Sequence, residues 1–163
     1  MTDAPLTAVP RERSLAHAGF TLTREYPSPI ADVWNAFAIE SLKKRWFGED
    51  DSWAIGEWRF DFRIGGCDVA EGTFHDGPHS RYEAVYTSIV EHERIVTTYN
   101  MWIDGTHIST SVASYEFEVV PGGTRLTHAE HGIHLDGFDT GEQREAGTIE
   151  LLESLRSFLA SEH

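Results

Sequence analysis

The sequence predicts a single α+β domain in which a bent antiparallel sheet of about six or seven strands wraps around one long C-terminal helix. From about residue 53 to residue 131, short runs alternate apolar and polar residues and are broken by turn residues. Two short helical patterns precede these runs, and one long amphipathic pattern closes the chain. That closing helix can bury its apolar side only against the sheet.

Length and composition support one folded, cytoplasmic domain. The 163 residues suit a single domain, and 40% hydrophobic residues with 12% aromatics can fill a core. The formal net charge of −14 argues against nucleic acid and anionic membranes as partners. No apolar run reaches the length of a membrane span, the N-terminus lacks the apolar core of a signal peptide, and the lone Cys67 fits a reducing compartment.

The N-terminal third predicts an arm, a strand and two short helices. We expect residues 1–14 to form a flexible arm without an assigned function, and residues 15–163 to form the domain. Alternation over Gly19–Tyr26 predicts the first strand. Ser28 and Pro29 suit the cap and first position of a helix, and Ser41 suits the cap of a second helix that ends at Gly48. The basic run at residues 43–45 of that helix predicts a solvated face.

The remaining elements are a strand meander and the long helix. Glycine-containing or polar clusters predict turns, which imply antiparallel neighbours, at residues 65–66, 76–78, 91–93, 104–105 and 121–123. Thr140 and Gln143 have capping-box spacing, which predicts the start of the last helix. Its apolar stripe consists of Ile149, Leu152, Leu155 and Leu159, broadened by Leu151 and Phe158.

One strand predicts an internal cavity. Between residues 107 and 119, parity places Tyr115, Phe117 and Val119 on the inward face. Followed back along the strand, that face carries only Ala113, Ser111, Ser109 and His107, so large apolar side chains give way to small and polar ones. This change leaves volume unfilled, and an apolar wall with a few polar groups is typical of small-molecule sites.

The register of the preceding strand decides which residues share that volume. A three-residue turn at 104–106 places Tyr99 opposite Ser111, Met101 opposite Ser109, and Ile103 opposite His107. A two-residue turn would place Arg94 opposite Tyr115, which burial disfavours. On the next strand, Leu126 shares its parity with His128 and Glu130. The alternative is a β-bulge that turns the polar residues towards water.

Four segments carry a resemblance to a known family: Arg24–Trp34, Arg45–Gly48, Phe60–Gly66 and Gly122–Thr127. In order and spacing they resemble the START-like or SRPBCC superfamily, and most closely the proteins named after the activator of the heat-shock protein 90 ATPase, over residues 19–160. The resemblance implies the helix-grip fold, with a ligand pocket between the sheet and the last helix. Superfamily members include lipid carriers, hormone receptors, polyketide cyclases and aromatases, so the fold alone does not define a reaction. The co-chaperones that lend the name carry an additional N-terminal domain, which this chain is too short to contain.

We therefore predict a binding or carrier protein for a small hydrophobic or aromatic molecule. The second hypothesis is a cyclase-like or aromatase-like enzyme, with His128, Glu130 and Tyr99 as candidates for proton transfer. The third is a chaperone-interacting protein, and a homodimer is left open. The predicted cavity residues, some of which core packing explains equally well, are Trp46, Phe60, Phe62, Tyr99, Met101, His107, Ser109, Ser111, Tyr115, His128, Glu130 and Leu152.

No cofactor or metal is predicted. His128, Glu130, His131, His134 and Asp136 crowd into nine positions, and such side chains are zinc ligands in other proteins. However, strand parity sends His131 to the face opposite His128 and Glu130. We therefore interpret these histidines as surface residues rather than as a metal site.

Overall fold

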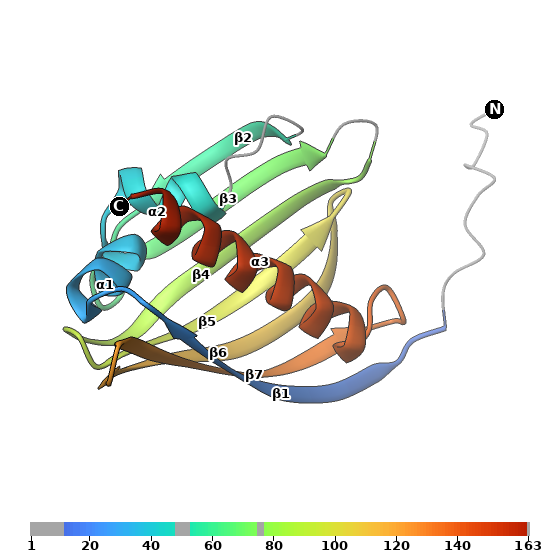
Figure 1. Ribbon diagram of the computed structural model, residues 1–163. Coiled ribbons are helices and arrows are strands. Elements are labelled where there is room, and N and C mark those ends of the chain that lie inside the picture. Colours follow the sequence, from blue (N-terminus) through green and yellow to red (C-terminus); the bar gives the residue numbers. More distant parts are fainter. Residues whose placement is uncertain (1–11, 48–52, 75–76, 163) are drawn as a thin grey trace, which may run out of the picture.

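A computed structural model describes residues 12–47, 53–74 and 77–162 of the chain. It contains one antiparallel sheet of seven strands in the order β1-β7-β6-β5-β4-β3-β2, which confirms the predicted helix-grip fold (Figure 1). The elements are β1 (Leu15–Tyr26), α1 (Ile30–Ala38), α2 (Glu40–Phe47), β2 (Trp53–Phe60), β3 (Cys67–Phe74), β4 (His79–Val90), β5 (Arg94–Ile103), β6 (Thr106–Val120), β7 (Gly123–Leu135) and α3 (Gly141–Ser161). Most of the expected N-terminal arm, the expected helix end at Gly48 and the expected turn residue Asp76 lie outside the described residues.

The three helices lie on one side of the curved sheet. Helix α3 crosses its concave face, and α1 and α2 lie near the C-terminal end of α3 (Figure 1). The predicted capping box is present, because the Thr140 side chain accepts from the Gln143 backbone and the Gln143 side chain accepts from the Thr140 backbone. These two bonds satisfy N–H groups that otherwise have no partner at a helix start.

The starts of the short helices differ from the prediction. Pro29, not Ser28, is the residue before α1, and its ψ of 151° keeps it extended. The carbonyl oxygen of Ser28 instead accepts a hydrogen bond from the Thr124 hydroxyl at 2.7 Å, which ties this corner to β7. Helix α2 begins at Glu40, so Ser41 lies within its first turn rather than capping it.

The main hydrophobic core lies beneath the C-terminal half of α3. Leu152, Leu155, Phe158 and Leu159 are buried there against side chains of α1 and of strands β6 and β7. Burial of a side chain of this size contributes about 1.5–3 kcal/mol, so this half of α3 anchors the helix. Val119 was expected inside but is 69% exposed near the end of β6.

The hairpin between β5 and β6 corrects one step of the register prediction. The turn has two residues, Asp104 and Gly105, with φ values of 49° and 80°. Both positions require positive φ, which aspartate tolerates and glycine adopts freely. As a result Ile103 pairs with Thr106, and the prediction that it faces His107 is wrong.

A β-bulge restores the predicted pairing further along the same strands. Met101 pairs with Ser109 but Trp102 pairs with His107, so Ile108 is an extra residue on β6. Beyond the bulge, Tyr99 pairs with Ser111 as predicted. A two-residue turn without a bulge would shift the pairing of the two strands by one residue and place Arg94 opposite Tyr115. The bulge cancels this shift, so the two-residue turn is compatible with the predicted pairing.

Candidate functional site

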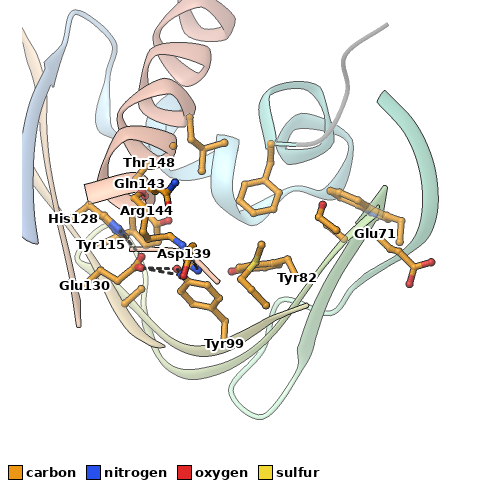
Figure 2. Close-up of a pocket in the computed structure, with 18 residues that line it drawn as sticks. Glu71, Tyr82, Tyr99, Tyr115, His128, Glu130, Asp139, Gln143, Arg144 and Thr148 are labelled. Atoms are coloured by element: carbon orange, nitrogen blue, oxygen red, sulfur yellow. Dashed lines mark hydrogen bonds and ion pairs between the residues drawn. The ribbon is translucent and has the colours of Figure 1, made fainter. Parts of the chain in front are cut away.

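A cavity of about 500 Å³ lies between the N-terminal half of α3 and the concave face of the sheet (Figure 2). Its lining combines aromatic and small apolar side chains with a polar group at the α3 side. The lining residues are Phe47, Trp58, Ala70, Glu71, Ser80, Tyr82, Tyr99, Met101, Ala113, Tyr115, His128, Glu130, Asp139, Gln143, Arg144, Gly147, Thr148 and Leu151.

The sheet side of the cavity is aromatic. The rings of Tyr82 and Tyr99 lie 5.0 Å apart, and Met101 and Ala113 pack beside them. Burial, more than any neighbouring charge, raises the pKa of Tyr82, Tyr99 and Tyr115 above the usual value. These three phenols are therefore neutral at physiological pH, and this side presents rings and small apolar groups to a ligand.

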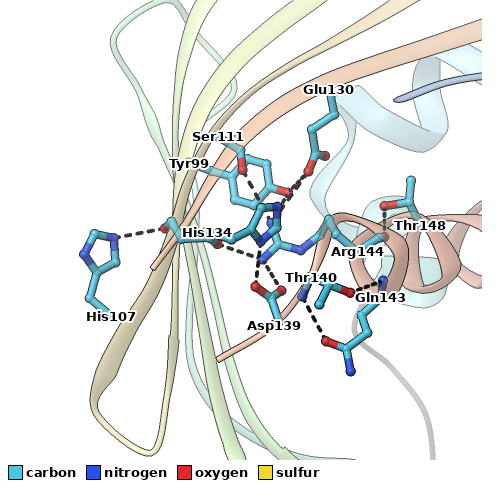
Figure 3. A network of polar contacts seen from close by, with 11 residues as sticks. Tyr99, His107, Ser111, Glu130, His134, Asp139, Thr140, Gln143, Arg144 and Thr148 are labelled. Atoms are coloured by element: carbon cyan, nitrogen blue, oxygen red, sulfur yellow. Dashed lines mark hydrogen bonds and ion pairs between the residues drawn. The ribbon is translucent and has the colours of Figure 1, made fainter. Parts of the chain in front are cut away.

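The polar end is built where α3 meets β5 and β7 (Figure 3). One terminal nitrogen of Arg144 donates to the Tyr99 hydroxyl at 2.8 Å, and that hydroxyl donates to Glu130 Oε2 at 2.6 Å. The guanidinium lies 3.6 Å from the same oxygen. Tyr99 therefore bridges a buried carboxylate and a cation whose side chain is 12% exposed.

The other terminal nitrogen of Arg144 donates to Ser109 Oγ at 2.7 Å and to Asp139 Oδ2 at 2.9 Å. The second Asp139 oxygen lies 2.6 Å from Nδ1 of His134. Burial lowers the pKa of Arg144, but its interactions with Tyr99, Asp139 and Glu130 outweigh burial and raise it overall. Arg144 is thus a permanent cation held by the protein itself.

His128 differs from its neighbours because its polar atoms are unused. Its ring lies 4.4 Å from the Tyr115 ring and 5.9 Å from the Phe20 ring, and the residue is 1% exposed. Nε2 is 3.4 Å from Glu130 Oε1, yet neither ring nitrogen forms a hydrogen bond with any described residue. Buried polar groups usually have a hydrogen-bonding partner, so His128 stands apart from the other polar residues of the lining.

Five of the sequence-predicted residues lie together in the cavity lining: Tyr99, Met101, Tyr115, His128 and Glu130. Ser109 and Ser111 are buried beside it, but both accept hydrogen bonds from Arg144. The space that these small residues leave is therefore filled by the Arg144 side chain. The open volume lies nearer β3 and β4 than the sequence indicated.

His107 does not line the cavity, which corrects the prediction. The bulge at Ile108 turns His107 to the other side of the strands, as Figure 3 shows. Its Nε2 lies 3.2 Å from Asn100 Oδ1 and 3.1 Å from Thr110 Oγ1. A bulge reverses the inward and outward sides of a strand, so parity counted through it fails.

Four further predicted residues also lie outside the cavity lining. Trp46 is buried in the core, where its indole N–H donates to the Ala36 carbonyl at 2.8 Å. Phe60 and Phe62 stack on each other near the two short helices, because β2 ends there. Leu152 belongs to the core, and Leu151 lines the cavity instead, since one residue rotates a side chain by about 100° around a helix.

Sequence analysis missed Arg144, Asp139, Tyr82 and Thr148. A signal was present for two of them, because Arg144 and Thr148 extend the buried stripe of α3 at intervals of four residues. An arginine on the inward side of a helix calls for buried acidic partners. Asp139 and Tyr82 had no comparable signal, since their roles depend on how the chain turns before α3 and on the pairing of β4 with β5.

The predicted surface histidines are only partly at the surface. His131 is exposed, but His128 is 1% exposed and His134 is 2% exposed and hydrogen-bonded to Asp139, so interpreting these two as surface residues was wrong. Among residues 12–47, 53–74 and 77–162, no group of three or more histidine, cysteine or acidic side chains is arranged to hold a metal ion. Within the same ranges, no helix combines the length and apolar character needed to cross a membrane.

Comparisons with known proteins place this architecture in a family. The model of the family described as "Activator of Hsp90 ATPase homolog 1-like protein" matches residues 27–160. Protein Mll3558 from Rhizobium loti is 38% identical, with 89% of this chain and 99% of that chain covered and a TM-score of 0.82. An uncharacterized protein from Rhizobium leguminosarum is 34% identical, with 92% and 99% covered and a TM-score of 0.87.

A more distant structure shares the fold alone. The AHSA1-like protein from Aeromonas hydrophila is 18% identical, with 88% of this chain and 93% of that chain covered and a TM-score of 0.66. A search of curated proteins found no match.

Proposed function

Since the chain belongs to the family of activator of Hsp90 ATPase homolog 1-like proteins, we propose that it binds one small hydrophobic or aromatic molecule in the cavity beneath α3. The fold family commonly binds hydrophobic ligands. The observation that carries the proposal for this chain is a cavity of about 500 Å³ with an aromatic side and a polar end. Ligand pockets typically have this size and this mixture of many apolar and few polar groups.

A large side chain introduced on the sheet side of the cavity tests the proposal. Ala113 on β6 is 3% exposed and packs among Tyr99, Tyr82 and Met101, so Ala113→Phe places a ring in the ligand volume. The preceding residue, Val112, lies on the opposite face of the strand and is 44% exposed, so Val112→Phe is the matched control. Both proteins and the wild type are screened against lipids and aromatic molecules by native mass spectrometry and thermal shift.

The expected result is a ligand that raises the melting temperature of the wild type and of Val112→Phe, but not that of Ala113→Phe. A ligand that binds only the folded state must raise stability, by about 2.7 kcal/mol at a hundredfold excess over Kd. Equal binding by all three folded proteins would place the ligand elsewhere and reject the proposal. Circular dichroism tests whether Ala113→Phe is folded. If this variant does not fold, Gly147→Phe replaces it, because Gly147 lines the same cavity from the α3 side.

A second candidate function is proton transfer on the bound molecule, of the cyclase or aromatase kind. The observation that favours it is the separation of 3.4 Å between Nε2 of His128 and Oε1 of Glu130, two residues that line the cavity. A histidine next to a carboxylate is a common general acid or base. This candidate requires that the ligand is converted, so chemical analysis of the ligand after incubation with wild type and with His128→Phe distinguishes an enzyme from a carrier.

A further inference from the structure

The polar end of the cavity restricts the chemical class of its ligand, because most of its polar atoms already form hydrogen bonds within the protein. Arg144 would ordinarily suggest an anionic ligand, because a guanidinium binds carboxylates and phosphates in bidentate fashion. Its terminal nitrogens carry four of its five N–H donors. They donate to Tyr99, Ser111, Ser109 and Asp139 at 2.8, 3.4, 2.7 and 2.9 Å. An anionic ligand would have to displace these partners.

The local charge also opposes an anion. Two carboxylates, Glu130 and Asp139, lie within 3.6 Å of the single guanidinium of Arg144. The Glu130 side chain is 4% exposed, so water screens it poorly. A ligand carboxylate at this end would add a third negative charge to one positive charge.

His128 and Glu130 offer a complementary pair of hydrogen-bonding atoms. Glu130 Oε2 accepts from Tyr99, and Oε1 faces the His128 ring, 3.4 Å from Nε2. An ionised carboxylate only accepts, whereas a histidine nitrogen donates or accepts according to its tautomer. A hydroxyl group beside this pair complements both atoms, because it donates one hydrogen bond and accepts another.

We propose that the cavity selects an uncharged aromatic molecule carrying a hydroxyl group, which donates to Glu130 Oε1 and accepts from His128 Nε2. This inference rests on the proposed ligand-binding function and specifies its ligand class. The ring system of the ligand lies against Tyr82, Tyr99 and Tyr115. Tilted ring contacts with Tyr115 and Phe20, at 4.4 and 5.9 Å between ring centres, hold the imidazole of His128 in place before the ligand arrives.

Three probes with one ring system test the proposal: 2-naphthol, 2-naphthoate and 2-methylnaphthalene, titrated at pH 7 by calorimetry or by tyrosine and tryptophan fluorescence. We expect 2-naphthol to bind at least about tenfold more tightly than 2-methylnaphthalene, because only the hydroxyl satisfies His128. We expect 2-naphthoate to bind most weakly. Tightest binding of 2-naphthoate, or equal binding of all three, would overturn the inference and leave the proposed function standing.

Failure of all three probes, together with failure of the lipid and aromatic screen, would instead reject the proposed function. In His128→Phe the preference for 2-naphthol over 2-methylnaphthalene should disappear, while 2-methylnaphthalene still binds. The matched control is His131→Phe, because His131 lies on the same strand, faces outwards and is exposed.

If His128→Phe does not fold, Glu130→Gln provides an independent test, since glutamine keeps the shape of the side chain and removes its charge. This variant should bind 2-naphthoate more tightly than the wild type does, by about tenfold. An unchanged affinity for 2-naphthoate in a folded Glu130→Gln protein would show that charge does not exclude the anion, and would contradict the inference.

Discussion

Beneath α2, Lys43 forms an ion pair with Asp68 and lies 3.3 Å from the Tyr86 hydroxyl, which donates to Asp68 at 3.0 Å. We call these three residues the Lys43 cluster. Beneath α3, Arg144 is held by Tyr99, Glu130, Asp139 and Ser109, which we call the Arg144 cluster. Both clusters combine a cation with little exposure, a buried carboxylate and a tyrosine, but the space around them differs. The Lys43 cluster adjoins a void of about 10 Å³, whereas the Arg144 cluster adjoins the cavity of about 500 Å³.

The difference indicates distinct roles for similar chemistry. A void of about 10 Å³ holds at most about one water molecule, so the Lys43 cluster has room for nothing larger. Its ammonium is further enclosed by the rings of Phe47 and Phe60, at 4.6 and 5.5 Å. The Lys43 cluster therefore supports the fold, while the Arg144 cluster positions Glu130 and Tyr99 at the surface of the large cavity.

The largest effect is expected from Lys43→Met. Removing one partner of a buried ion pair leaves the other charge uncompensated, which costs about 3–5 kcal/mol of the free energy of unfolding. Asp68 is 1% exposed, and its Oδ1 already has no hydrogen-bond partner among the residues that the structure describes. Urea unfolding monitored by circular dichroism measures the loss. The folded fraction should bind the cavity ligand with unchanged affinity.

The matched control is Lys44→Met on the same helix. Lys44 is partly exposed and lies 5.5 Å from the Trp58 ring, so its loss should cost less than about 1 kcal/mol. Equal unfolding free energies for the two variants, or a weakened ligand affinity in Lys43→Met alone, would erase the distinction between the two clusters.

Sequence patterns predicted the fold well because the fold depends on local signals. Alternation within the strands, the capping box at Thr140 and the glycine-containing turns each lie within a few neighbouring residues. The error at Ile103 arose where two local signals competed. The Asp104-Gly105 pair favours a two-residue turn, and only a bulge elsewhere on β6 reconciles it with burial of Tyr115.

The site was less predictable because it depends on contacts between distant segments. Strand parity identified His128, Glu130 and Tyr99 as inward residues, and all three line the cavity. Parity could not show that Arg144 fills the space above Ser109, since this requires the position of α3 on the sheet. Lys43 was expected on a solvated face for the same reason, because its partner Asp68 belongs to another element.

Alkaline pH should weaken the protein through both clusters. Burial and the adjoining carboxylate raise the pKa of Tyr86 and of Tyr99, and burial raises the pKa of Tyr26 to about 12. Unfolded tyrosines ionise near pH 10, so above that pH the unfolded chain releases protons that the folded chain retains. Stability is therefore fully present below about pH 10 and falls as pH rises further, by about 1.4 kcal/mol per pH unit for each such tyrosine.

Phenolate absorbance and circular dichroism, followed together, measure this effect. Both signals should change in a single step at the alkaline unfolding transition. Tyr86→Phe and Tyr99→Phe should each flatten the decline in stability with pH by a similar amount, because each removes one tyrosine with a raised pKa. Phenolate formation near pH 10 in a protein that remains folded would mean that these phenols are open to water, against the burial of both clusters.

The smallest effect concerns the open side of the cavity at Gly147. A Cβ added there would meet no described atom within 4 Å apart from its chain neighbours and its own helix backbone, whereas a Cβ on Gly141 of the same helix would clash with Ala18 Cβ. Gly147→Ala should stabilise the protein by about 0.5–1 kcal/mol, because alanine restricts the unfolded chain and favours helix. Gly141→Ala should destabilise it, because the two Cβ atoms cannot be so close. Urea unfolding of both variants measures the two signs, and a destabilised Gly147→Ala would mean that α3 packs on the sheet at this point as closely as it does at Leu152, with no open volume beneath it.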